Sequence, residues 1–192
     1  LCPRGRVAVF VAGVGFLEMT LQLTILLGFQ ALAGQLYHHL ALLTALNMGG
    51  LAMGGWVGSR PRVALRPAAP ALLAGAMLCL VAWGLGRFLP VIPASPPWPS
   101  AGLGGMALVT GFLGGAAFAF SVGVAARRVG DEARRGSALY AWDLVGAGVA
   151  TLVTGLVLIP VLGLPKAAVL GGELCLIAVI VLLPTLGRTR VG

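Results

Sequence analysis

Hydrophobic residues run along this chain in six long stretches, which short segments rich in charge and proline separate. A helix needs about 20 mostly apolar residues to cross the hydrocarbon core of a bilayer. Six windows meet this length, at about 7–30, 35–58, 69–90, 101–126, 138–163 and 166–187. The pattern predicts an all-α polytopic membrane protein in which residues 1–192 form one domain of six transmembrane helices.

The segments between the windows contain residues that end or interrupt membrane helices. Residues 59–67 hold three arginines and two prolines, residues 90–100 hold five prolines, and residues 126–137 are the most charged part of the chain. In the last connection, GLPK (163–166), Pro165 cannot continue the preceding helix but suits the first turn of the next. These breaks support six separate spans.

Composition and charge agree with this class. The chain is 59% apolar and 9% charged, its mean hydropathy is +1.02, and its net charge is +8. With six spans, 11 of the 13 Lys and Arg residues fall on one side of the membrane. This positive-inside bias predicts that both termini are cytoplasmic. It also accounts for the basic charge, so we expect membrane lipids as partners and no nucleic acid.

Nothing in the sequence indicates a cofactor, a metal site or a catalytic centre. The three cysteines form no CxxC pair, and the only two histidines, His38 and His39, are adjacent and point about 100° apart on a helix. The glycine clusters of the second and fourth windows lack the Lys-Ser/Thr of a phosphate loop and resemble helix-packing surfaces. The first residues lack the short apolar core and cleavage site of a signal peptide. We therefore expect a non-enzyme without cofactors.

Three acids lie inside predicted spans: Glu18, Asp143 and Glu173. A carboxylate near the middle of the bilayer costs about 3 kcal/mol on insertion scales, so it must be neutral, paired, hydrated or hidden in the bundle. No Lys or Arg of the sequence lies at similar depth. Glu173 lies nearer the outer face and has the weakest case for a role.

Glu18 is predicted to meet polar residues of the first two spans. It follows Arg6 by 12 residues, and Asn47 precedes Ser59 by 12 residues on the antiparallel second span. At 1.5 Å per residue, both lie about 18 Å from the cytoplasmic end. Gln22, one turn after Glu18, shares its face. We expect a polar clamp between these helices; the alternative is a site that handles protons or cations.

Asp143 is predicted to lie near the cytoplasmic end of the fifth span. It follows Ser137, the expected N-cap, by six residues and so lies about 9 Å inside the boundary. Tyr140 shares its face. We favour a tether to the basic loop through Arg134 or Arg135 over a cation site formed with Tyr140.

Two stretches resemble the membrane part of bacterial spermidine-synthase-like polytopic proteins. FQALAGQLYHHLALLTALNMGGLAMGG (29–55) and LYAWDLVGAGVATLVTGLVLIPVLGL (139–164) carry the similarity. The matching positions are Glu18, Phe29, Gln30, Gly34, Tyr37, Met48, Gly50, Leu51, Ala52, Gly54, Tyr140, Asp143, Gly146, Gly155, Pro160 and Gly163.

The resemblance implies a six-helix half of a major-facilitator-type bundle in the bacterial inner membrane, built from two inverted three-helix repeats. The aminopropyltransferase-like domain of that family is absent from these residues. Asn47 stands where an apolar residue is usual, and the loop GGWVGSRPR (54–62) lacks the acid that such transporters carry there.

Three functions remain open from the sequence. The first is a non-catalytic module that serves as anchor or accessory subunit for a protein partner or for a second copy. The second is a transporter or half-transporter for a cation, a polyamine or a proton-coupled solute. The third is a cofactor-free subunit of a membrane redox complex.

Overall fold

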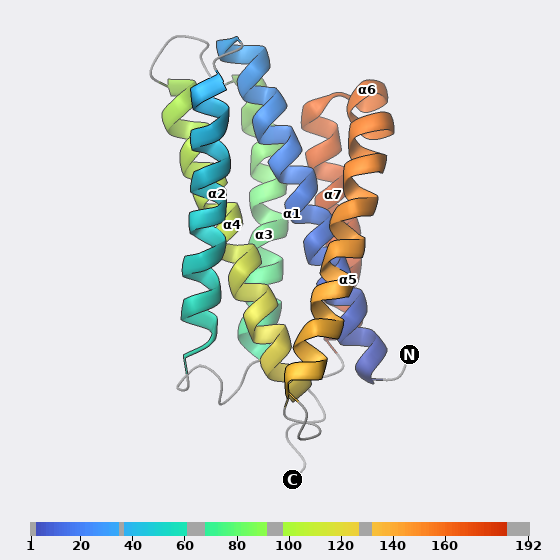
Figure 1. Ribbon diagram of the computed structural model, residues 1–192. Coiled ribbons are helices and arrows are strands. Elements are labelled where there is room, and N and C mark those ends of the chain that lie inside the picture. Colours follow the sequence, from blue (N-terminus) through green and yellow to red (C-terminus); the bar gives the residue numbers. More distant parts are fainter. Residues whose placement is uncertain (1–2, 35–36, 61–67, 92–97, 127–131, 184–192) are drawn as a thin grey trace.

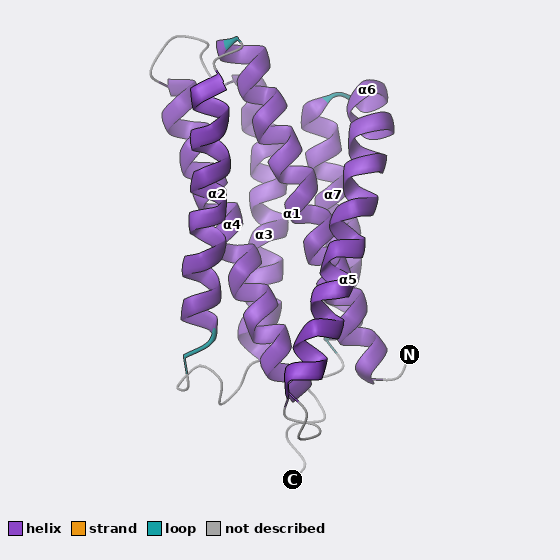
Figure 2. Ribbon diagram, viewed as in Figure 1, coloured by secondary structure: helices purple, strands orange, loops and turns teal. Residues whose placement is uncertain are grey.

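The structure is a computed structural model that describes residues 3–34, 37–60, 68–91, 98–126 and 132–183. Its described residues form helices without strands (Figures 1 and 2). In chain order these are α1 (Pro3–Ala33), α2 (Tyr37–Gly58), α3 (Ala68–Phe88), the 3-10 turn η1 (Leu89–Val91), α4 (Trp98–Ala126), α5 (Glu132–Val153), the π-helical turn η2 (Thr154–Leu158), α6 (Ile159–Leu162) and α7 (Leu164–Leu182).

Six of these segments are long and apolar enough to cross a membrane, which confirms the predicted class. The segments α5, η2 and α6 run on as one span, Gly136–Leu162. Successive spans alternate in direction, so α1 begins and α7 ends at the same end of the bundle (Figure 1). The turn predicted at 163–166 is present, with Gly163 at φ 81° and Pro165 in the first turn of α7.

Helix α5 begins before the apolar window that was predicted for the fifth span. Ser137 is not its N-cap, because α5 starts at Glu132. Residues 132–135 are Glu-Ala-Arg-Arg, all good helix formers that extend the helix beyond the apolar window. Asp143 consequently lies 11 residues into α5, about 16 Å along its axis. The side chains of Arg134 and Arg135 lie outside the described part, and so does their predicted contact with Asp143.

A π-helical turn interrupts the same span before Pro160. The backbone N–H of Ile159 donates to the carbonyl of Thr154, five residues back. Proline has no N–H and its ring crowds the preceding turn, so a helix that continues through it must rearrange locally. The turn also positions Thr154, whose buried hydroxyl lies 3.0 Å from that of Thr20 on α1.

The helices pack mainly across the two halves of the chain. Helix α2 packs on α4, α5 on α1, α3 on α4, α7 on α1, and α3 on α7, while α1 also crosses α4. Exchanging α1 with α4, α2 with α5 and α3 with α7 leaves this set of neighbours unchanged. Each exchanged pair runs in opposite directions (Figure 1). The bundle therefore consists of two inverted three-helix repeats.

The repeats also correspond residue by residue. Gly146 follows Gly50 by 96 residues, and a Cβ on either glycine would collide with a backbone carbonyl, that of Ala12 for Gly146 and that of Leu108 for Gly50. Ala12 and Leu108 are themselves 96 residues apart. The same shift aligns GAMLCLVA (75–82) with GGELCLIA (171–178), which are identical at five of eight positions.

Helices α1 and α4 form the interior of the bundle. In each of them 56% of the most apolar window is buried, against 22% in α2 and 17% in the fifth span. Helices α2 and α5 thus lie at the margin, each supported by one central helix.

Candidate functional site: a polar recess at the crossing of α1 and α4

Glu18 lies where α1 crosses α4. It is partly buried, and its carboxylate rests against Gly114 of α4, where a Cβ would collide with it. Gly114 follows Glu18 by 96 residues, so the two occupy equivalent positions of the two repeats. Equivalent residues that touch must lie at the pseudo-two-fold axis. The chain thus has an acid in one repeat and, in the other, the glycine that makes room for it.

Asn47 approaches Glu18 from α2. Its side chain is buried, and its Oδ1 accepts a hydrogen bond of 3.4 Å from the hydroxyl of Thr110 on α4. Its side chain also hydrogen-bonds the Glu18 carboxylate. Because Oδ1 is used by Thr110, the amide nitrogen is the donor to Glu18. The structure places these two residues together, as their depths predicted, although α2 reaches α1 across α4 and not by direct packing along its length.

Asp143 approaches Glu18 from α5, on the opposite side of the axis. A Cβ on Gly15 would lie 2.6 Å from Asp143 Oδ1, and Gly15 precedes Glu18 by three residues on the same face of α1. The two carboxylates are close enough to interact electrostatically. Asp143 follows Asn47 by 96 residues, so an amide and an acid occupy equivalent positions beside Glu18. Asp143 is level with Gly15, so it lies about one helical turn nearer than Glu18 to the end of the bundle where α1 begins.

Gln22 lies one turn after Glu18 on α1. Its side chain is 8% exposed, and its Oε1 has no hydrogen-bond partner among the described residues. A buried amide oxygen without a donor costs about 1–3 kcal/mol. Among the described residues, this oxygen is therefore an unsatisfied acceptor beside Glu18.

The structure does not bring Tyr140 and Glu173 into this cluster. Tyr140 is 54% exposed, and its ring packs edge-on against Phe118 of α4 at 6.4 Å between centroids. Glu173 is exposed on α7, which packs on α1 and α3.

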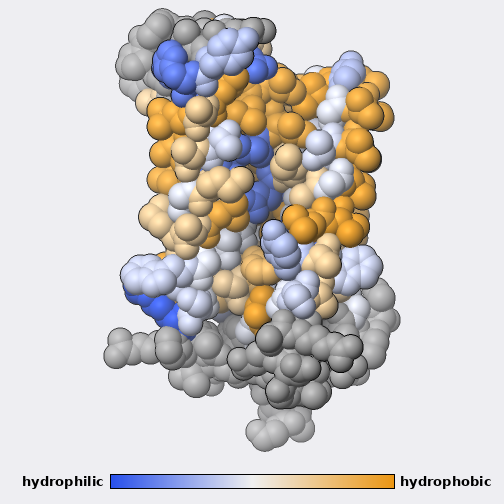
Figure 3. Space-filling view, viewed as in Figure 1, coloured by the Kyte–Doolittle hydropathy of each residue, from blue (hydrophilic) through white to orange (hydrophobic). Residues whose placement is uncertain are grey.

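The polar side chains form a recess on one face of the bundle. Figure 3 shows a hydrophilic strip at mid-height, set back between the apolar surfaces of the two flanking helices α2 and α5. The recess comprises Glu18, Gln22, Asn47 and Asp143, and we use the term polar recess for these four residues. Glu18 and Asp143 are partly buried while Gln22 and Asn47 are buried behind them, so the two carboxyl groups are the part of the recess suited to accept hydrogen bonds from a cationic donor.

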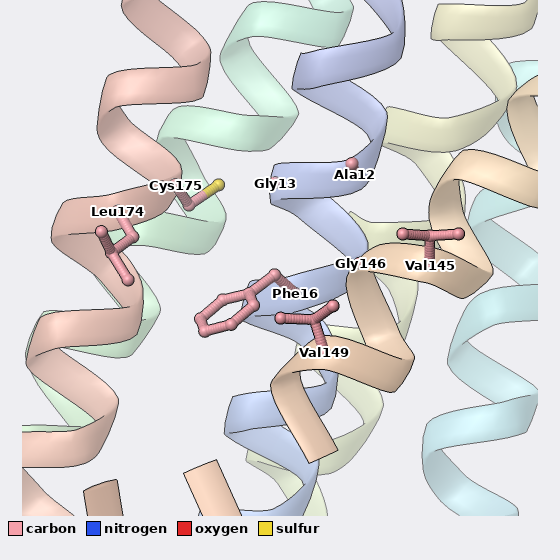
Figure 4. Close-up of a pocket in the computed structure, with 8 residues that line it drawn as sticks. All are labelled: Ala12, Gly13, Phe16, Val145, Gly146, Val149, Leu174 and Cys175. Atoms are coloured by element: carbon pink, nitrogen blue, oxygen red, sulfur yellow. The ribbon is translucent and has the colours of Figure 1, made fainter. Parts of the chain in front are cut away.

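The described residues offer no alternative metal or redox centre. No three His, Cys, Asp or Glu side chains among them gather closely enough to hold a metal ion. A second cavity, of about 300 Å³, lies between α1, α5 and α7. In it Leu174 and Cys175 face Phe16 and Val149 (Figure 4), a lining that suits hydrocarbon.

The resemblance implied two inverted repeats, but the 96-residue register between them and the cysteine pair that it aligns went unrecognised in the sequence. The 96-residue repeat was detectable from the shared GFL of 15–17 and 111–113 and from the two LCL triplets, at 78–80 and 174–176. It pairs Cys79 of α3 with Cys175 of α7. Both are free thiols, and their side chains lie in hydrogen-bonding contact.

Comparisons of the chain with known protein families, with curated proteins and with solved structures give no match. The case for function therefore rests on the recess and on the architecture around it.

Proposed function

We propose that this chain is a non-catalytic integral membrane module that acts as the anchor or accessory subunit of a larger assembly in the bacterial inner membrane. The observation that carries the proposal is the polar recess at mid-membrane depth, whose two carboxyl groups are only partly buried by this chain. An accessory subunit would bind its partner there.

The energetic argument concerns what faces the recess in a bilayer. Lipid tails offer no hydrogen bonds, and a charged side chain at the helix centre costs about 2.5–3.5 kcal/mol on insertion scales. Two carboxyls that are only partly buried in the bundle therefore favour any protein surface that supplies donors. Helices α2 and α5 also expose apolar side chains on their outer surfaces, among them Met48 on α2 and Leu144 on α5.

The orientation of the module follows from its charges. With six spans, 11 of the 13 basic residues fall on the side of the membrane where α1 begins. The positive-inside bias then puts both termini in the cytoplasm. A cytoplasmic catalytic domain or partner chain would be held at that face.

Photo-crosslinking in native membranes tests the proposal. A benzophenone amino acid replaces Tyr140, which is exposed on α5 three residues before Asp143, and in a matched variant it replaces Ile177, which is 59% exposed on α7. We expect a discrete protein adduct from position 140, identifiable by mass spectrometry, and only lipid adducts from position 177. Lipid adducts alone at both positions would contradict the proposal.

A second candidate function is transport of a cation or of a proton-coupled solute, by one copy or by a dimer of half-transporters. The adjacent carboxyls of Glu18 and Asp143 favour it, since paired acids in the membrane mark many ion and proton pathways. Cation uptake into proteoliposomes that is lost in Glu18→Gln, with the variant still folded, would support this function. Uptake that is the same in the variant and in empty vesicles would exclude it.

A further inference from the structure

Two basic residues are exceptions to the charge bias of the chain. With six spans, only Arg87 and Lys166 fall on the membrane side opposite to both termini. Arg87 lies four residues before the end of its span, Ala69–Val91, and Lys166 lies two residues after the start of Leu164–Leu182. Near the ends of spans, the long side chains of Arg and Lys extend to the level of the lipid headgroups.

The two residues lie close together, where α3 ends and α7 begins (Figure 1). A Cβ on Gly86 would lie 2.7 Å from the backbone carbonyl oxygen of Pro165. Arg87 directly follows Gly86, and Lys166 directly follows Pro165, so their Cα atoms are at most about 11 Å apart. Two such long side chains can reach one group that lies between them.

Both side chains also turn to the same side of the helix pair. One position along a helix is a rotation of about 100°, and α3 and α7 run in opposite directions (Figure 1). From the contact of Gly86 with Pro165, these rotations carry Arg87 and Lys166 to the same side, where both are exposed. The Arg87 guanidinium lies 5.7 Å from the centre of the Trp83 ring, which is itself exposed, and this cation–π contact holds it at the lipid-facing surface.

No acid of the chain lies beside this basic pair at the membrane surface. The sequence has five Asp and Glu residues, and none of them belongs to the connections at this end of the bundle. On α7 the first acid, Glu173, follows Lys166 by seven residues and lies about 10 Å deeper. The 96-residue shift pairs Arg87 with Leu183 and Lys166 with Pro70, so the basic pair is not a consequence of the repeat.

Charge and depth together define the ligand. Two neighbouring cations bind an anion, and phosphate oxygens accept hydrogen bonds from both Arg and Lys. At the depth of a span end, the phosphate of a lipid headgroup is the anion that the membrane itself supplies. An acyl chain of the same lipid finds apolar surface on Trp83 and Leu80, which are exposed one and two turns deeper on α3.

We propose that Arg87 and Lys166 form a binding site for the phosphate of an anionic phospholipid, at the membrane face opposite to both termini. The site is independent of the polar recess and of the proposed accessory function. A lipid bound there bridges α3 of one repeat and α7 of the other.

Quenching of Trp83 fluorescence by brominated lipids tests the proposal in nanodiscs with the full chain. Trp83 is kept as the only tryptophan by replacing Trp56, Trp98 and Trp142 with Phe. The discs consist of phosphatidylcholine with a minor share of either brominated phosphatidylglycerol or brominated phosphatidylcholine. The ratio of the two quenching constants measures the preference of the site for the anionic lipid.

We expect a preference of about 25-fold, because each basic residue near a membrane surface contributes about fivefold. Arg87→Gln and Lys166→Gln should each lower the preference by about fivefold, and the double variant should abolish it, while Arg87→Lys should retain most of it. Arg60 provides a matched control, since its guanidinium lies 4.1 Å from the centre of the Trp56 ring at the opposite end of the bundle. Arg60→Gln should leave the preference unchanged.

Equal quenching by the two brominated lipids would overturn the proposal. So would a preference that survives in the double variant, or one that falls equally in Arg60→Gln. Inorganic phosphate, added at constant ionic strength, should leave the quenching unchanged; displacement of brominated phosphatidylglycerol would identify a soluble anion as the ligand and overturn the lipid site. Because each single variant carries the same comparison, loss of folding in the double variant would not remove the test.

Discussion

At the scale of single residues, the contacts in the core depend on glycines at which two helices approach to backbone distance. At Gly54 of α2, an added Cβ would collide with the carbonyl oxygen of Phe112 and lie 2.8 Å from the backbone nitrogen of Ala116. Backbone atoms of a packed helix cannot move aside as a flexible side chain can. Its neighbour Gly55 would meet nothing within 4 Å.

These neighbouring glycines give a matched pair of substitutions. Gly54→Ala should lower the free energy of unfolding by about 1–3 kcal/mol, because α2 must move away from α4. Gly55→Ala should leave stability unchanged or raise it by up to about 1 kcal/mol, the difference in helix propensity between the two residues. Denaturant unfolding in detergent micelles, followed by tryptophan fluorescence, measures both. Equal effects would contradict the close approach of α2 to α4.

The polar recess illustrates what a single sequence can reveal about a site. Counting residues from the helix ends placed Glu18 level with Asn47, because both spans have the regular rise of an α-helix. The prediction of Ser137 as the N-cap of the fifth span was wrong, since the start of α5 at Glu132 depends on the helix propensity of a charged segment that hydropathy excludes. The role of Gly114 was not predictable, because only the crossing of α1 over α4 brings it to Glu18.

At the scale of elements, hydropathy was sufficient to find every span but not to pair them. Six apolar windows predicted six helices, since a bilayer admits few other solutions for such segments. The neighbours of each helix depend on small residues spaced along it, and these carry little hydropathy signal. The clamp was therefore expected between α1 and α2 alone, whereas α4 lies at its centre.

Helices α3 and α7 meet through the equivalent cysteines of the two repeats. Because the thiols of Cys79 and Cys175 are in contact, we expect an added oxidant such as copper phenanthroline to join them with the loss of two protons and two electrons. Counting of thiols with a maleimide polymer under denaturing conditions should then detect one free thiol, that of Cys2, in place of three. A Cys79→Ser control should keep two thiols, Cys2 and Cys175.

An unchanged count of three thiols after oxidation would contradict the packing of α3 on α7. Loss of thiols in dimers, seen on a non-reducing gel, would point instead to a cysteine at the surface. The reaction thus reports on one helix pair independently of the recess.

At the scale of the whole molecule, the alternating direction of six spans puts the connections on two opposite sides. Ser59, at the end of α2, and Val91, after α3, are both exposed and lie at opposite ends of the bundle. In a variant without native cysteines, Ser59→Cys should resist a membrane-impermeant maleimide in intact spheroplasts, and Val91→Cys should react. Reaction of the two positions in the reverse order would invert the proposed orientation.

The interleaving of the two repeats leads to a second prediction at this scale. Each helix of one half packs mainly on helices of the other half, so neither α1–α3 nor α4–α7 has a core of its own. A chain cut between residues 94 and 95, in the connection between α3 and α4, should yield two fragments that fold only together. Co-expressed fragments should copurify through a tag on one of them and elute from size exclusion in detergent like the intact chain, while each fragment alone should aggregate or be degraded.

The substitution Gly54→Leu in the first fragment should weaken the association, and Gly55→Leu should spare it, since only Gly54 lies against α4. A single half that purifies as a folded, stable unit would contradict the interleaved packing and, with it, the placement of Glu18 on the axis between the repeats.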